Sequence, residues 1–146
     1  MANSLRLVYL AGPVDLDYTN DKLQWRHRAS RELAEHNICS YNPPAAFRWV
    51  GGTHQASKLI RINEMALRQS DAMLLHLNST ITIGSIRELQ QAINLNMPVV
   101  LWTPGGAYAM YENSLYLAGI QRHDTLEDAI RTLVNTPLHH LTAGVV

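Results

Sequence analysis

The chain has 146 residues, and its hydrophobic content of 47% and charged content of 16% are typical of one globular domain over residues 1–146. Its 12 basic and 12 acidic residues cancel, which argues against a polynucleotide or an anionic membrane as partner, and no apolar run approaches the length of a membrane span. One cysteine, Cys39, excludes an internal disulfide, and no cysteine–histidine spacing is typical of zinc, so we expect a cytoplasmic protein without a metal, with Cys39 inert in the core.

The first predicted strand, residues 6–11, is an almost continuous apolar run that ends at Gly12-Pro13. Such a run is typical of a strand that is buried on both faces of a parallel sheet. A helix over 20–35, capped by an asparagine, and a second short strand at 38–41 follow.

The later segments repeat this alternation of helix and strand. We expect a helix at residues 57–70, a strand at 72–77 and a helix from 83 onward. A strand at 98–102, a weak strand at 118–120 and a helix that ends at about 135 follow. Asp124 and Glu127 have the spacing of a capping box for the last helix. The pattern predicts a single three-layer α/β domain, with a parallel flavodoxin-like or Rossmann-like sheet of about five strands.

In such a sheet, ligands bind at the carboxyl ends of the strands, near the point where the strand order reverses. The segments 12–17, 42–54, 78–88 and 103–106 all follow predicted strands, so we expect them to share one rim. Function is therefore to be sought among their side chains.

Glu88 is the most informative residue of that rim. We place it in the first turn of its helix, where the positive end of the helix dipole favours the ionised carboxylate. A stripe of Ile86, Leu89 and Ile93 at helical spacing would hold the helix against the sheet. Taken alone, the pattern favours a glutamate that only stabilises the helix terminus.

Three motifs occur in order along the chain. They are Tyr9-Leu10-Ala11-Gly12-Pro13, the helix-to-strand run 62–77 with Ser70-Asp71-Ala72 at its joint, and Thr82-Ile83-Gly84-Ser85-Ile86-Arg87-Glu88. The sequence resembles the nucleoside 2-deoxyribosyltransferase family, which also includes nucleoside 5′-monophosphate N-glycosidases, and the third motif is similar to the family's S-x-G-T-x-x-E. With the strand at 98–102, the likeness spans roughly two thirds of the chain.

The resemblance implies cleavage or transfer of the N-glycosidic bond of a (2′-deoxy)nucleoside through a covalent glycosyl intermediate on Glu88. A fixed carboxylate can stabilise positive charge at the anomeric carbon and then bond to it. A second base or water would release the sugar, and no cofactor is implied.

The family usually places an aspartate where this chain has Asn63, counting back from Asp71. An amide can donate and accept hydrogen bonds, but it cannot supply a proton to the departing base. Glu64 or Asp15 would then have to substitute, or the chain prefers a base that leaves easily, or it has lost turnover.

The resemblance also implies roles for other residues. Tyr9 would orient Glu88, and Asn113 would reach the active site of a neighbouring subunit, which implies a homodimer or a larger homo-oligomer. The residues expected to contact the nucleoside or nucleotide are Gly12, Pro13, Asp15, Trp49, Thr82, Gly84, Ser85 and Asn113.

Three functions remain open. Transfer between free nucleosides is favoured because Asp15 and Asp17 in the first loop would repel a phosphate. Hydrolysis of a nucleoside 5′-monophosphate is the first alternative, with Arg87 and Ser85 as phosphate ligands. A non-catalytic nucleotide-binding or sensing protein is the second, suggested by Asn63. Asp71 is interpreted as structural, and His76 is expected to be buried and paired.

Overall fold

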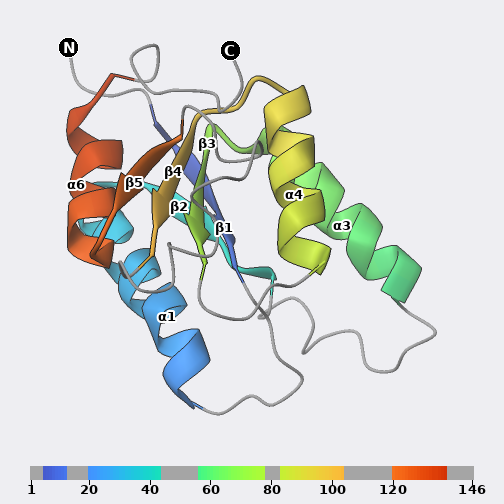
Figure 1. Ribbon diagram of the computed structural model, residues 1–146, viewed down its shortest axis with the longest axis horizontal. Coiled ribbons are helices and arrows are strands. Elements are labelled where there is room, and N and C mark those ends of the chain that lie inside the picture. The colour runs from blue at the N-terminus through green and yellow to red at the C-terminus, as the bar shows by residue number, and fades with distance from the viewer. Residues whose placement is uncertain (1–4, 13–19, 44–55, 78–82, 104–119, 138–146) are drawn as a thin grey trace.

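The computed structural model describes residues 5–12, 20–43, 56–77, 83–103 and 120–137 (Figure 1). Strands and helices alternate along the chain, as the sequence predicts. The elements are β1 (Leu7–Ala11), α1 (Asn20–Glu35), β2 (Cys39–Tyr41), α3 (Ala56–Gln69), β3 (Ala72–His76), α4 (Ile83–Asn94), β4 (Val99–Trp102), β5 (Gln121–His123) and α6 (Leu126–Asn135).

The five strands form one parallel sheet in the order β2-β1-β3-β4-β5, which confirms the predicted flavodoxin-like α/β fold. The chain runs from β1 outward to β2 and then returns to place β3 on the other side of β1. The strand order therefore reverses between β1 and β3. The carboxyl ends of these two strands form the switch point at which open α/β sheets bind ligands.

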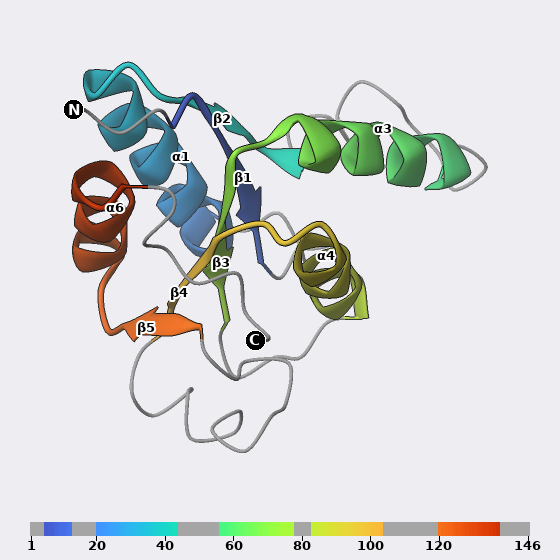
Figure 2. The ribbon, with the colours of Figure 1, turned by 90° about the horizontal axis from the view of Figure 1, so that it is seen from above.

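Two apolar cores lie on the two faces of the sheet. Helices α1 and α6 cover one face, and α3 and α4 cover the other (Figure 2). Alternate residues of each strand enter alternate cores, because successive side chains of a strand point to opposite faces. On β1, Val8 and Leu10 face α1 and α6, whereas Tyr9 and Ala11 lie in the core that contains Leu67 and Leu89.

The joint between α3 and β3 anchors the start of β1. Asp71 accepts hydrogen bonds through Oδ2 from the backbone N–H groups of Arg6 (2.8 Å) and Leu7 (2.9 Å). The Asp71 N–H in turn donates to the carbonyl of Leu7 at 2.8 Å. These contacts support the structural interpretation of Asp71.

Three local predictions were wrong. Cys39 is exposed, because it lies on the short edge strand β2, and Ile38 enters the core instead. The fifth strand follows residues 118–120 and consists of polar residues 121–123, since it too is an edge strand held mainly by its ladder with β4. The cap of α6 is Thr125, whose hydroxyl accepts from the Asp128 N–H at 3.2 Å, one residue later than the expected capping box.

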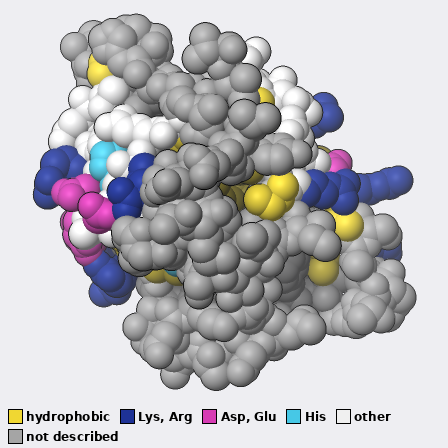
Figure 3. Space-filling model, viewed as in Figure 1, with side chains coloured by type: hydrophobic (Ala, Val, Ile, Leu, Met, Phe, Trp, Pro, Cys, Tyr) yellow, Lys and Arg dark blue, Asp and Glu magenta, His cyan; other side chains and the backbone are white. Residues whose placement is uncertain are grey.

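The described charged side chains are of mixed sign. On the face shown in Figure 3, acidic and basic side chains gather together over α6. Three ion pairs join residues of this region, namely Arg28–Glu127, Arg122–Asp124 and Arg131–Asp128. None of the helices in the described ranges is long and apolar enough to cross a membrane.

Candidate active site

Glu88 lies in the second turn of α4, not in the first turn as expected from the sequence. The helix dipole acts mainly within the first turn, so it contributes less to this carboxylate than predicted. Burial raises the pKa of Glu88 from 4.5 to about 7, against the opposing effects of Tyr9 and Arg26. One carboxylate oxygen, Oε2, is buried without a hydrogen-bond partner among the described residues. The group is thus a desolvated carboxyl that titrates near neutral pH.

Tyr9 is fully buried on β1, and its phenol lies beside Glu88. Burial and the neighbouring Glu88 carboxylate both raise the pKa of Tyr9, so the phenol keeps its proton. The Tyr9 hydroxyl is close enough to lower the pKa of Glu88, but no hydrogen bond of ordinary geometry joins the two groups. Tyr9 therefore lies beside the carboxylate with a hydroxyl that is unpaired among the described residues, and its orienting role stays a prediction.

Tyr41 links Tyr9 to Asn63. The rings of Tyr9 and Tyr41 stack with centroids 5.4 Å apart, because β1 and β2 pair these two residues in register. The Tyr41 hydroxyl donates to Oδ1 of Asn63 at 2.8 Å. Burial raises the pKa of Tyr41, and Glu88 raises it further. The structure thus brings Glu88, Tyr9, Tyr41 and Asn63 into one cluster.

Arg26 adds a positive charge to the cluster. This residue of α1 is fully buried, and it donates from Nη1 to the Leu10 carbonyl (2.5 Å) and from Nη2 to the Gly12 carbonyl (3.0 Å). Its guanidinium also lies 4.8 Å from the ring centre of Trp25. Burial lowers the pKa of Arg26 to about 10, and Glu88 and Tyr9 act in the opposite direction. At neutral pH the guanidinium is charged.

Gly12 occupies the carboxyl end of β1, where a side chain has little room. A β-carbon at this position would lie 3.0 Å from the ring of Trp25 and 3.1 Å from the carbonyl oxygen of His76. The described structure therefore explains this glycine by close packing against Trp25 and β3. Its expected contact with a sugar stays a prediction.

Glu64 is engaged away from this cluster. Its Oε1 accepts from Arg87 (3.0 Å) and from Nε2 of Gln91 (2.9 Å), which links α3 to α4. A groove beside these contacts is lined by Glu64, Leu67, Arg68, Gln91, Asn94 and Leu95, and Glu88 is not among them. The ion pair argues against Glu64 as the substitute acid and also occupies Arg87.

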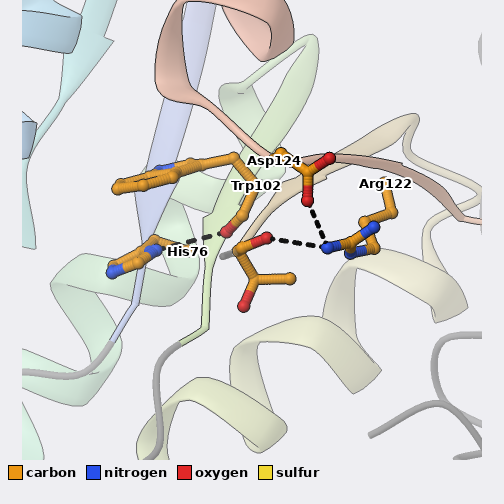
Figure 4. A network of polar contacts seen from close by, with 5 residues as sticks. His76, Trp102, Arg122 and Asp124 are labelled. Carbon is orange, nitrogen blue, oxygen red and sulfur yellow. Dashed lines mark hydrogen bonds and ion pairs between the residues drawn. The ribbon is translucent and has the colours of Figure 1, made fainter. Parts of the chain in front are cut away.

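The ends of β3, β4 and β5 carry a separate polar network (Figure 4). The ring of His76 stacks on Trp102 at 3.8 Å, and its Nδ1 lies 3.2 Å from the Trp102 carbonyl. Arg122 donates to the Thr103 carbonyl and to Asp124. Burial lowers the pKa of His76 to about 4, so the ring is neutral near pH 7. His76 is paired and half-buried, in agreement with its predicted structural role.

The remaining candidate residues divide into two groups. Gly84 and Ser85 lie in the first turn of α4, and Ser85 is buried. The others are outside the described residues, so their roles stay predictions: Pro13, Asp15, Trp49, Thr82 and Asn113. Within the described ranges, no group of three or more histidine, cysteine or acidic residues could hold a metal ion.

Sequence reasoning missed Arg26 and Tyr41. A signal for Arg26 exists, because it stands at helical spacing from Ala29 and Leu33, two residues of the buried stripe of α1. Tyr41 has no such signal. Its place beside Tyr9 depends on the register of β1 and β2, which periodicity does not determine.

The fold defined by this sheet and its helices is shared with several solved structures. The 2-deoxyribosyltransferase from the psychrotolerant bacterium Bacillus psychrosaccharolyticus is similar with a TM-score of 0.64 and 20% identity, over 90% of this chain and 98% of that one. A conserved protein from Enterococcus faecalis V583 is similar with a TM-score of 0.66 and 19% identity, over 89% and 98% of the two chains.

A third solved structure is the CMP N-glycosidase BcmB from Clostridium botulinum. Its TM-score is 0.57 and its identity 11%, over 88% of this chain and 97% of that one. No protein-family model matches the sequence, and no curated protein matches it either. Because these three identities are 20% or lower, the likeness establishes a shared fold, and activity has to be argued from the site.

Proposed function

We propose that the protein cleaves the N-glycosidic bond of a nucleoside or nucleotide, with Glu88 as nucleophile. The observation that carries this proposal is a desolvated carboxyl on α4 that is influenced by a protonated tyrosine of β1 and by a buried arginine bound to the carboxyl end of β1. A carboxyl that titrates near neutral pH combines a substantial ionised fraction with high basicity. These are the properties of a nucleophile that must attack an anomeric carbon.

In the proposed reaction, an oxygen of the ionised Glu88 bonds to C1′ as the bond from C1′ to the base nitrogen breaks. The electron pair of that bond leaves with the base, and the sugar becomes an ester of Glu88. A nitrogen of a second base then attacks C1′ and releases Glu88, or a water molecule does so. No metal or organic cofactor enters these steps.

Transfer of a 2-deoxyribosyl group between bases is the activity we favour, in keeping with the similarity to the 2-deoxyribosyltransferase. Hydrolysis of a nucleoside 5′-monophosphate is the alternative, favoured by the similarity to the CMP N-glycosidase. The ion pair of Arg87 with Glu64 supports transfer, because it occupies the cation that was expected to bind a phosphate. We further propose that the active protein is a homodimer or a larger homo-oligomer.

Base release and base exchange distinguish these activities. The purified protein is incubated with deoxyinosine or with dCMP, each with and without a second free base, and the products are separated by chromatography. The favoured function predicts a new nucleoside only when the second base is present. Release of free base alone, without exchange, would instead support hydrolysis. No reaction with either substrate, together with measurable binding, would support the sensing alternative.

A further inference from the structure

Arg26 is a buried cation, and the described residues bind it through neutral groups. Its side chain has no solvent exposure, and within the described ranges it donates to two backbone carbonyls, those of Leu10 and Gly12. Burying a charge is costly unless an opposite charge lies nearby. Among the described residues, no carboxylate forms a direct ion pair with Arg26. A neutral donor could also bind two backbone carbonyls, so these hydrogen bonds alone do not explain why a full positive charge is buried here.

Three elements supply the described groups that act electrostatically on Glu88. Tyr9 of β1 and Tyr41 of β2 interact with the carboxylate as neutral phenols, and Arg26 of α1 interacts with it as a cation. On α3, Glu64 is held by Arg87 and Gln91. Arg26 is therefore the described cation whose charge acts on Glu88.

The carbonyls that Arg26 binds frame the site. Leu10 and Gly12 flank the last residue of β1, and Tyr9 immediately precedes them. The guanidinium thus fixes the backbone that carries Tyr9 and ends at the switch point. The Arg26 side chain of α1 therefore both positions the end of β1 and adds a positive charge to the cluster.

We propose that Arg26 is a positioning residue of the candidate active site, which fixes the carboxyl end of β1 through two carbonyls and favours the ionised form of the Glu88 carboxylate. The importance of Arg26 for catalysis rests on the proposed function, in which Glu88 is the nucleophile. The effect of Arg26 on the ionisation of Glu88 can be measured without turnover.

The test is an NMR titration of the Glu88 side-chain carboxyl in the full-length protein, with the resonance assigned by its loss in Glu88→Gln. Arg26→Gln removes the charge but keeps an N–H donor, and Arg26→Lys keeps the charge. We expect the Glu88 midpoint to rise by about one pH unit or more in Arg26→Gln and to stay near its original value in Arg26→Lys. Arg131→Gln, which removes an exposed arginine of α6, is the matched control and should change nothing.

An unchanged Glu88 midpoint in Arg26→Gln would overturn the proposal, since a purely structural arginine leaves that midpoint in place. If Arg26→Gln does not fold, the guanidinium resonances of Arg26 are followed from pH 5 to pH 8 in the unmodified protein and in Glu88→Gln. The proposal expects them to move with the titration of Glu88 and to become flat in Glu88→Gln. Resonances that are flat in both proteins would refute it.

Kinetics separate this proposal from the proposed function. If the protein releases or exchanges bases, the acidic limb of the kcat/KM profile should shift to higher pH in Arg26→Gln. A shift of one pH unit corresponds to about a tenfold loss of kcat/KM below neutral pH. Absence of any base release, with the NMR coupling intact, would refute the glycosidic function and leave the role of Arg26 in the ionisation of Glu88 standing.

Discussion

At the scale of single residues, the cluster around Glu88 is a balance between burial and charge. Burial opposes the ionised carboxylate, whereas Tyr9 and Arg26 favour it, and the resulting pKa of about 7 lies near neutral pH. The ring of Tyr41 stacks on Tyr9 and its hydroxyl donates to Asn63, so contacts link the residue at the position of the usual acid to Tyr9, whose phenol lies beside the carboxylate.

The first prediction concerns the pH dependence of stability. Glu88 has a pKa of 4.5 as its ordinary value and about 7 in the folded protein, so the folded state holds a proton that the unfolded state releases between these values. The free energy of unfolding should therefore fall as the pH rises from 4.5 to 7, by roughly 3 kcal/mol at about 1.4 kcal/mol per pH unit. Urea unfolding of the protein and of Glu88→Gln across this range measures the difference. A gap between the two proteins that does not vary with pH would contradict the raised pKa.

The second prediction concerns the departing base. In Asn63→Asp, the Tyr41 hydroxyl can still donate to the side chain, and the new carboxyl can supply a proton. We expect about 10²-fold faster release of a poorly leaving base, because general acid catalysis contributes factors of this size. Release of a base that departs easily should change little and serves as the control. Equal or slower release of the poor leaving group would show that Asn63 does not interact with the base.

At the scale of elements, the site depends on the position of β1, and Asp71 anchors the start of that strand. Asp71→Ala removes the acceptor for the N–H groups of Arg6 and Leu7, and we expect it to reduce the free energy of unfolding by about 1–3 kcal/mol. Chemical denaturation measures this loss. In Asp71→Asn the amide oxygen can still accept, so this variant should lose less. Equal losses in both variants would argue that the carboxylate charge, and not the acceptor oxygen, is what matters.

The elements also show where sequence reasoning succeeds. The central strands β1, β3 and β4 are apolar runs buried on both faces, and their hydrophobic pattern alone locates them within one residue. The edge strands β2 and β5 bury less, so Cys39 was wrongly assigned to the core and β5 was expected too early in the chain. The start of α4 was recognised correctly, but counting Glu88 into its first turn overstated the effect of the helix dipole.

At the scale of the whole molecule, the sequence predicted a parallel α/β sheet but not the order of its strands. The contacts at the rim of the sheet depend on tertiary packing. Pairing of β1 with β2 brings Tyr9 beside Tyr41, and the crossing of α1 behind β1 brings Arg26 to the carboxyl end of that strand. Neither contact is encoded in a local pattern. The resemblance to the nucleoside 2-deoxyribosyltransferase family predicted roles for Glu88 and Tyr9, and the fold shared with the solved 2-deoxyribosyltransferase agrees with that resemblance.

The most direct test of this account is mass spectrometry of the protein after rapid acid quenching during incubation with deoxyinosine or dCMP. The account predicts a peptide containing Glu88 that is heavier by one glycosyl group, and the same peptide without the addition in Glu88→Gln. Base release by the unmodified protein that proceeds equally fast in Glu88→Gln, with no adduct on this peptide, would contradict the role of Glu88 as nucleophile.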